Sequence, residues 1–155
     1  MNSHNNAIKN VTCINIGMYE HALTKGKVYT VFNENIRNYR IEGNHGKRVW
    51  ISKFYFIEGS EEIPLLVSWN FDDDVSEDLI DVTFSFSDGT RRWAIITTPE
   101  KLVNHFNNKK IHPPGINIHH LIILRSLNED DVNITFKYMD QHNKLTEATL
   151  QLKNE

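Results

Sequence analysis

A run of carboxylates in the middle of the chain is the first group of residues whose type and spacing could do chemistry. Six acids fall within the ten residues from Asp72 to Asp81. Clustered carboxylate oxygens suit Ca²⁺, but an EF-hand loop starting at Asp72 would need Gly at its sixth position and Glu at its twelfth, where the chain has Glu77 and Thr83. The run therefore predicts a solvated loop or a docking surface for a protein partner. Its candidate contact residues are Asp72, Asp73, Asp74, Glu77 and Asp78.

Four of the eight histidines lie near one another in sequence and could bind a metal ion. They are His105, His112, His119 and His120. Zinc requires roughly three or four nitrogen, sulfur or carboxylate donors that converge at about 2 Å. His105 and His119 could converge, but no His-x-x-x-His or Cys-x-x-Cys spacing supports a site. We interpret these residues as unrelated surface and loop histidines. A metal-binding protein or small enzyme built on His105 to His120 is the alternative.

Nucleophilic catalysis would require an activated side chain, and the chain has a single cysteine, Cys13. Its nearest possible base in sequence is His21, and the spacing favours a packed strand residue over a nucleophile. No serine lies in a Gly-x-Ser-x-Gly turn, and no glycine-rich phosphate loop occurs. We therefore predict a protein that is not an enzyme and needs no cofactor.

Composition sets limits on the class of protein. The 155 residues are 39% hydrophobic and 24% charged, which is ordinary for a soluble globular protein. No run approaches the roughly 18 apolar residues that a membrane-spanning helix needs, and the N-terminus lacks the basic and apolar regions of a signal peptide. The expected location is the cytoplasm, with no membrane partner.

Charge is distributed unevenly along the chain. Residues 1–60 contain eight Lys and Arg against four Asp and Glu, whereas residues 61–155 contain nine against sixteen. Halves of opposite sign could attract each other or have different partners. A surface that binds nucleic acid usually has a denser basic patch, so nucleic acid is not expected to be the main partner. A barrel that binds nucleic acid through Lys47, Arg48 and Lys53 is a further alternative.

The elements that would position these residues begin with several short strands. Side chains alternate from Val28 to Phe32 with the period of a strand. Further strands are predicted for Val11 to Ile16, Tyr39 to Glu42 and Arg48 to Ile51, the last two joined by the Gly-Asn-His-Gly loop from Gly43. Strands this short, joined by tight turns, indicate a small antiparallel barrel.

Three motifs within residues 13–56 carry a resemblance to a known family. They are Cys-Ile-x-x-x-x-Tyr-Glu from Cys13, Leu-Thr-x-Gly-Lys-x-Tyr-x-Val from Leu23, and Trp-x-x-Lys-x-Tyr-Phe from Trp50. This part of the chain resembles the short SH3-like barrels of Gram-positive bacteria and their phages. The resemblance implies a barrel with an aromatic groove. Two features depart from peptide-binding SH3 domains: Ser52 stands at the position of their usual proline, and the acidic loop that binds basic ligands is missing. The implied groove residues are Tyr19, Tyr39, Trp50 and Tyr55.

The second half of the chain reads as a sheet with two helices. Strands are expected for Ile63 to Phe71, for the two arms of a hairpin around Asp88-Gly89, for Leu121 to Leu124 as a strand buried on both faces, and for Glu147 to Leu152. Thr98-Pro99 predicts the start of one helix and Asn128 the start of another. The predicted apolar stripes are Leu102, Val103 and Phe106 in the first helix and Val132, Phe136 and Met139 in the second.

Together these patterns predict an α+β protein: an SH3-like antiparallel barrel over residues 1–60, then an acidic α+β domain over residues 61–155 with two helices over a mainly antiparallel sheet. We predict a non-enzymatic protein that binds another protein. A bacterial or phage inhibitor or immunity-type protein that neutralises a basic effector is the concrete hypothesis, since a carboxylate-rich loop can steer such an association.

Overall fold

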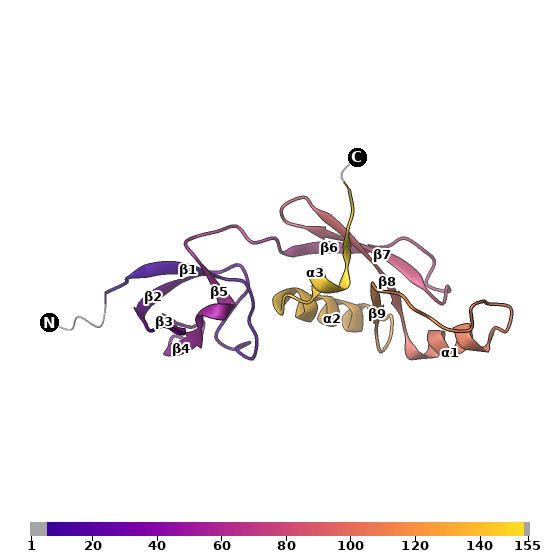
Figure 1. Ribbon diagram of the computed structural model, residues 1–155, viewed down its shortest axis with the longest axis horizontal. Coiled ribbons are helices and arrows are strands. Elements are labelled where there is room, and N and C mark those ends of the chain that lie inside the picture. Colours follow the sequence, from indigo (N-terminus) through magenta and orange to yellow (C-terminus); the bar gives the residue numbers. More distant parts are fainter. Residues whose placement is uncertain (1–5, 154–155) are drawn as a thin grey trace. The chain divides into compact units, whose positions relative to one another are not determined.

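Ten strands form two separate sheets in the computed structural model, which describes residues 6–153 (Figure 1). One unit is formed by the chain up to Leu65 together with Gln141–Asn143, and the other by Leu66–Asp140 and the residues from Lys144 on. The first unit is a curled antiparallel sheet, and the second combines a mixed sheet with helices. The predicted α+β class is confirmed.

The first sheet contains five strands in the order β4-β3-β2-β1-β5, and every pair is antiparallel. Its strands are β1 (Lys9–Cys13), β2 (Val28–Glu34), β3 (Asn38–Glu42), β4 (Arg48–Ser52) and β5 (Phe56–Glu58). A short 3₁₀ helix, η2 (Lys53–Tyr55), joins β4 to β5. This half-barrel is consistent with an SH3-like small barrel. The first strand begins and ends earlier than the predicted Val11 to Ile16.

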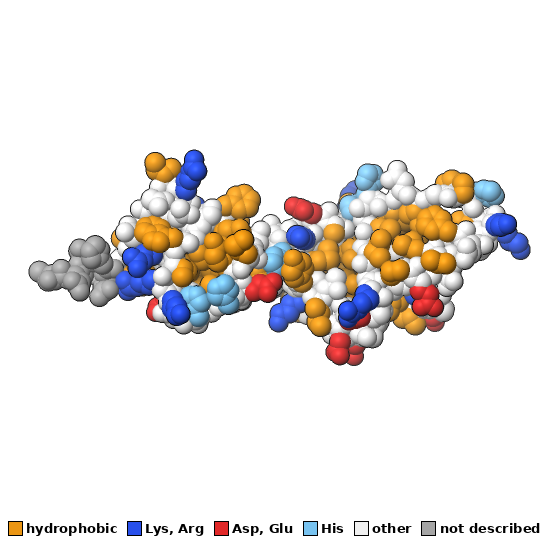
Figure 2. Space-filling model, turned by 90° about the horizontal axis from the view of Figure 1, so that it is seen from below, with side chains coloured by type: hydrophobic (Ala, Val, Ile, Leu, Met, Phe, Trp, Pro, Cys, Tyr) orange, Lys and Arg blue, Asp and Glu red, His pale blue; other side chains and the backbone are white. Residues whose placement is uncertain are grey.

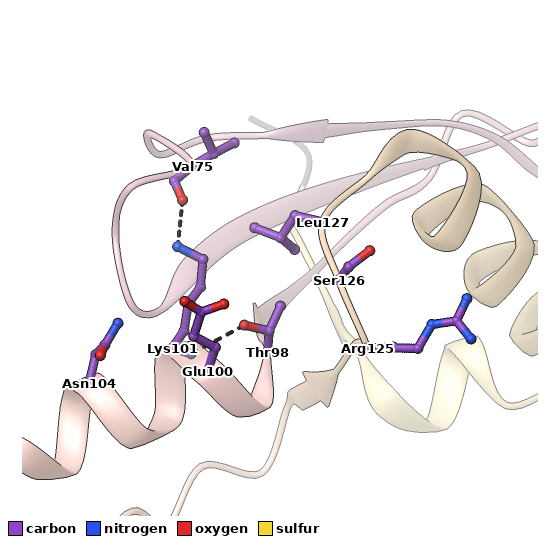
Figure 3. A pocket seen from close by; sticks show the side chains of 8 residues that line it. All are labelled: Val75, Thr98, Glu100, Lys101, Asn104, Arg125, Ser126 and Leu127. Atoms are coloured by element: carbon purple, nitrogen blue, oxygen red, sulfur yellow. Dashed lines mark hydrogen bonds between the residues drawn. The ribbon is translucent and has the colours of Figure 1, made fainter.

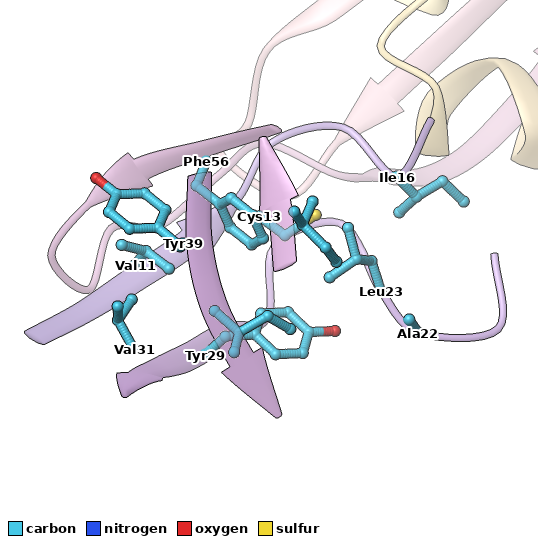
Figure 4. Close-up of a cluster of buried hydrophobic side chains, with 11 residues drawn as sticks. Val11, Cys13, Ile16, Ala22, Leu23, Tyr29, Val31, Tyr39 and Phe56 are labelled. Carbon is cyan, nitrogen blue, oxygen red and sulfur yellow. The ribbon is translucent and has the colours of Figure 1, made fainter. Parts of the chain in front are cut away.

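Alternation along β2 and β3 contributes much of the core of the first unit. In β3, Tyr39 and Ile41 are buried, whereas the residues on either side of them face outward. In β2, Tyr29 and Val31 are buried, and the residues on either side of them are more exposed. The buried side chains meet on the inside of the curled sheet (Figure 4). The core consists of Val11, Cys13, Ile16, Ala22, Leu23, Tyr29, Val31, Tyr39, Ile41, Ile51 and Phe56.

The second sheet has the order β10-β8-β7-β6, with β9 added beside β8. Its strands are β6 (Leu66–Phe71), β7 (Ile80–Phe86), β8 (Arg91–Thr97), β9 (Leu121–Ile123) and β10 (Leu150–Gln151). β7 and β8 form the predicted hairpin, and Gly89 in its turn has a φ of +85°, which glycine adopts without strain. β9 runs parallel to β8, and the other pairs are antiparallel.

Among the described residues, three helices follow β8: α1 (Pro99–Asn107), α2 (Glu129–Gln141) and α3 (Leu145–Ala148). Thr98 Oγ1 accepts from the Lys101 N–H, and Asn128 Oδ1 accepts from the Asp131 N–H, so both predicted helix caps are confirmed. α2 and α3 lie on one side of the second sheet (Figure 1). The core between the second sheet and these two helices consists of Ile80, Val82, Phe84, Phe86, Ala94, Ile96, Ile122, Leu124, Val132, Phe136 and Leu145.

Three predictions for the second unit were wrong in part. Val103 and Phe106 of the α1 stripe are exposed, and α1 has no buried residue, so only the stripe of α2 packs in the core. β9 pairs on one side only and buries only Ile122, so it is not an interior strand. The expected strand Glu147 to Leu152 is shortened because its first residues belong to α3.

Candidate functional site

An exposed group of aromatic rings marks the first unit. The rings of Tyr19 and Tyr55 meet edge to face with their centroids 5.6 Å apart, and Phe54 meets Tyr55 in the same way at 6.0 Å. Phe54 is 77% exposed, while Tyr19 and Tyr55 are half-buried and pack against the core. We call Tyr19, Phe54 and Tyr55 the aromatic surface. In this surface the exposed ring of Phe54 lies against Tyr55, and packing against the core holds Tyr55 and Tyr19 in place.

Local sequence fixes the position of these rings. Ser52, at the position where peptide-binding SH3 domains have proline, caps η2 because its Oγ accepts from the Phe54 N–H at 3.2 Å. Gly17 has a φ of +51°, and a Cβ on it would lie 2.5 Å from Cε1 of Tyr55. The missing side chain of Gly17 therefore makes room for the Tyr55 ring against the loop that carries Tyr19.

The other two predicted groove residues lie elsewhere. Tyr39 is a core residue with 5% exposure, so it offers no free ring to a ligand. Trp50 is 43% exposed and pairs across the strands with Arg40, on the face opposite to that of Tyr39 and Ile51. Neighbouring residues in a strand point to opposite faces, and this alternation separates Trp50 from the core side. Of the four predicted groove residues, Tyr19 and Tyr55 thus lie together, and Phe54 lies beside Tyr55.

The acidic loop of the second unit, residues 72–79, is ordered by its own carboxylates. Asp72 Oδ2 accepts from the Thr83 hydroxyl at 2.6 Å, and Asp73 Oδ2 accepts from the Asp81 N–H at 2.7 Å. Asp74 Oδ1 accepts from the Ser76 N–H at 2.8 Å, and the bonds from Ser76 lower the pKa of Asp74. Three predicted contact residues therefore also hold the loop in shape.

Backbone contacts fix the remaining part of the acidic loop. Lys101 Nζ donates to the carbonyl oxygens of Val75 and Glu77, and the Thr97 hydroxyl donates to the carbonyl oxygen of Asp78. The Glu77 side chain is exposed and the Asp78 side chain is half-exposed. These two carboxylates have no hydrogen bond or ion pair among residues 6–153 and are the part of the loop best placed to meet a partner.

A polar pocket of about 350 Å³ lies between the acidic loop, the first turn of α1 and the segment after β9 (Figure 3). Most of its polar groups already have partners, because Lys101 binds the loop and Arg125 and Ser126 both bind the Asp131 carboxylate. These bonds join α1 to the acidic loop and the segment after β9 to α2. Its lining consists of Val75, Thr98, Glu100, Lys101, Asn104, Arg125, Ser126 and Leu127.

The four clustered histidines form two pairs. His105 and His112 line a smaller pocket of about 190 Å³, and the rings of His119 and His120 lie 6.5 Å apart. Within residues 6–153, no three His, Cys, Asp or Glu side chains are placed to hold a metal ion. The alternative in which His105 and His119 converge on a metal therefore has no support in this part of the chain.

Cys13 is a packed core residue, as predicted. It is fully buried, and its thiol donates to the Asn15 carbonyl oxygen at 3.3 Å. Burial raises the pKa of Cys13 to about 11, so the thiol is protonated at neutral pH. His21 lies instead against His45, with ring centroids 5.5 Å apart.

The three basic residues that could bind nucleic acid, Lys47, Arg48 and Lys53, have different surroundings. Lys53 forms an ion pair with Glu34 at 2.8 Å and lies over the Tyr39 ring. The Arg48 guanidinium stacks 3.8 Å above the Phe32 ring, and Lys47 is exposed. The positive charge of Lys53 is partly neutralised, so these residues do not add up to a dense basic patch.

Two residues of these surfaces were not found by sequence reasoning. Phe54 follows the cap residue Ser52 by two positions, and that spacing is the signal that could have placed it on a 3₁₀ turn. The contacts of Lys101 with Val75 and Glu77 could not be predicted from local sequence, because they join segments more than twenty residues apart.

Two further findings bear on the class of protein. None of the helices within residues 6–153 has both the length and the apolar character that crossing a bilayer requires. No protein-family model, curated protein or solved structure matches this chain significantly.

Proposed function

We propose that the protein acts by binding another protein and does not catalyse a reaction. The observation that carries this proposal is the exposed ring of Phe54, 77% accessible and supported by Tyr55 and Tyr19. Aromatic side chains contribute strongly to protein interfaces because they bury a large area with few rotatable bonds. A ring that the fold already holds also loses little entropy on binding.

The contribution of the aromatic surface to the free energy of binding can be estimated from the apolar area that a partner would bury. A phenylalanine ring that becomes fully buried in a complex contributes about 2 kcal/mol, since apolar area is worth roughly 25 cal/mol per Å². Tyr19 and Tyr55 would add contact around it, and their hydroxyl groups suit the polar rim of an interface. The aromatic surface would therefore serve as the centre of a moderate protein–protein interface.

Affinity capture with matched variants tests this proposal. We expect the full-length protein to retain a defined partner from a bacterial lysate, and Phe54→Ser to lose most of that partner. Ile36→Ser is the control, because Ile36 is 93% exposed in the turn between β2 and β3 of the same unit. Equal capture by wild type, Phe54→Ser and Ile36→Ser would contradict a role for the aromatic surface.

For the concrete activity, we propose an inhibitor or immunity-type protein of bacteria or their phages that neutralises a basic effector. The resemblance of residues 13–56 to the short SH3-like barrels of Gram-positive bacteria and their phages supports it, and so does the acidic loop of the second unit. Glu77 and Asp78 extend from a loop that Lys101 already orders, so the loop would meet a basic partner without further ordering. Opposite charges would also speed association.

Substitutions that spare the loop's structure test the acidic contact. The double variant Glu77→Gln with Asp78→Asn removes two charges and leaves Asp72, Asp73 and Asp74 in place to order the loop. We expect it to slow association with the captured partner by about tenfold at low salt and less at high salt. Glu129→Gln with Glu147→Gln removes two charges from helices of the same unit. If both double variants slowed association equally, the loop would have no specific role.

A further inference from the structure

We propose that the uncovered face of the second sheet is a docking site for an amphipathic helix of the partner, with apolar side chains over β8 and Lys or Arg side chains over β7. This inference rests on the proposed function, because it names the segment of a basic partner that would lie next to the acidic loop. We call this side of the sheet the open face, and it is the side opposite α2 and α3.

The register of the strands places two kinds of side chain on the open face. Ile95 lies between Leu121 of β9 and Asp81 of β7 as direct strand partners. In the next row of the same face, Trp93 lies between Leu150 of β10 and Thr83 of β7. The open face is thus apolar over β8, β9 and β10 and polar over β7.

The apolar half of the open face is partly exposed, since Trp93, Ile95 and Leu121 are half-buried. α2 and α3 lie on the other side of the sheet (Figure 1). Leu150 is 50% exposed and Ile123, two residues after Leu121 on the same face, is 55% exposed. Hydrophobic side chains also gather on the side of this unit that Figure 2 shows. Val103 of α1 and Ile134 of α2 are exposed as well, but they lie on helices and not on the sheet.

The charges on the open face select a basic occupant. Asp81 lies beside Ile95, and the backbone N–H of Asp72 donates to the Asp81 carbonyl oxygen, which brings the acidic loop to this edge. Within residues 6–153, no Lys or Arg forms an ion pair with Asp72, Asp73 or Asp81. A partner's cation at this edge would therefore meet three uncompensated carboxylates.

The titration of Asp81 agrees with this arrangement. Burial raises its pKa, and the neighbouring charges of Asp73 and Asp72 act in the same direction, while the Trp93 indole N–H that binds the carboxylate acts against them. A lysine or arginine above Asp81 would relieve this repulsion. Arg91, two residues before Trp93, lies on the same face at the hairpin end, so an acidic residue of the occupant would suit that end.

The length of the open face along β8 suits a short helix. From Arg91 to Ile95, the part of β8 whose side chains on this face are not fully buried, a strand advances about 13 Å, which roughly nine residues of an α-helix match. A helix laid along β8 would complete a second helical layer, as α2 does on the other side. A second copy of the chain is less suited, because its own open face would bring acidic residues and no cationic row.

Peptide titration against the full-length protein tests the proposal. The probe is a fluorescein-labelled helical peptide of about 14 residues with Leu on one side and Lys along the adjoining side. The comparison peptide has the same composition in scrambled order. We expect the amphipathic peptide to bind about tenfold more tightly by fluorescence anisotropy, and Leu150→Ser and Asp81→Asn each to weaken it by roughly fivefold to tenfold.

Matched variants on the helix side of the same unit serve as controls. Ile134→Ser removes an apolar side chain that is 68% exposed on α2, and Glu147→Gln removes one acid from α3. Neither should change the affinity of the peptide. Circular dichroism would verify that Leu150→Ser is folded. Asp81→Asn is a second test of the peptide affinity, and this substitution preserves the size of the side chain.

Each contrary outcome has a distinct meaning. Equal binding of the scrambled peptide, or equal weakening by Glu147→Gln, would overturn the open-face site in favour of general charge attraction. Weakening by Glu77→Gln with Asp78→Asn but not by Leu150→Ser would also overturn it, while the proposed contact of the acidic loop would stand. A dimer in solution that Leu150→Ser dissociates would assign the open face to self-association and would overturn the proposal as well.

Discussion

Lys101 holds the acidic loop through the backbone of Val75: its Nζ donates to the Val75 carbonyl oxygen at 2.5 Å and to that of Glu77 at 2.8 Å. The ammonium group therefore neutralises none of the loop's carboxylates by direct pairing, although its charge lowers the pKa of Asp74 to a small extent. The loop gains order while its acidic side chains stay available to a partner.

The first prediction concerns this contact. Lys101→Met should preserve much of the packing of the aliphatic stem and remove both hydrogen bonds, with a loss of about 1 to 2 kcal/mol in the free energy of unfolding. Hydrogen exchange at the amides of Ser76 and Glu77 should become faster, because both belong to turns that Lys101 supports. Lys137→Met, on the exposed side of α2, is the control. Unchanged exchange in the Lys101 variant would show that the loop is ordered without it.

The second prediction separates two neighbouring residues of β4. Ile51 is fully buried, so Ile51→Ala should reduce the free energy of unfolding of the first unit by about 2 to 5 kcal/mol. Trp50→Ser, on the outer face, should change it by less than about 1 kcal/mol. Chemical denaturation of both variants would measure the difference. A larger loss for Trp50→Ser than for Ile51→Ala would contradict the register of β4.

Local signals in the sequence predicted much of the second unit. Asp88-Gly89 located the hairpin because a glycine in the turn can adopt a positive φ, and Gly89 does so at +85°. Thr98 and Asn128 located the starts of α1 and α2 because their side chains accept from free backbone N–H groups. Interactions within four residues of each other decide these features, and a single sequence contains them.

The candidate surfaces were harder to predict because they depend on contacts between distant segments. Periodicity placed Val103 and Phe106 on one face of a helix, but it could not show that both side chains are exposed. The resemblance grouped Tyr39 and Trp50 in one groove, although strand alternation places them on opposite faces. The last strand was shortened because Thr149 binds both Arg92 and the Leu145 carbonyl oxygen at the end of α3.

The third prediction concerns the support of the aromatic surface. Gly17→Ala should cost about 1 to 2 kcal/mol from the positive φ alone, because an L-residue is strained there. The new Cβ would also meet the Tyr55 ring at 2.5 Å and force it to move, which should weaken partner binding together with stability. Gly46→Ala is the control, since it has a similar positive φ of +82° and nothing near its Cβ position. Equal partner binding by both variants would contradict the role of Gly17.

The fourth prediction uses pH to compare two aspartates of the second unit. The pKa of Asp81 is raised in the folded protein, mainly by burial, so its ionised form destabilises the fold at neutral pH. Asp81→Asn should therefore raise the free energy of unfolding at pH 7. The gain should shrink as the pH falls through the pKa of folded Asp81 and vanish below the ordinary pKa of aspartate, about 4.

Asp131 should behave in the opposite way, because hydrogen bonds from Arg125 and Ser126 lower its pKa. Its stabilising effect is complete above about pH 4, where an unfolded aspartate is ionised, and is lost as the pH falls through the lower pKa of the folded state. Asp131→Asn should therefore destabilise the protein at pH 7 and have progressively less effect in acid. Urea denaturation of the wild type and both variants from pH 3 to pH 7 would measure how the change in the free energy of unfolding depends on pH. If this change had the same sign for Asp81→Asn and Asp131→Asn at pH 7, the assigned environments would be contradicted.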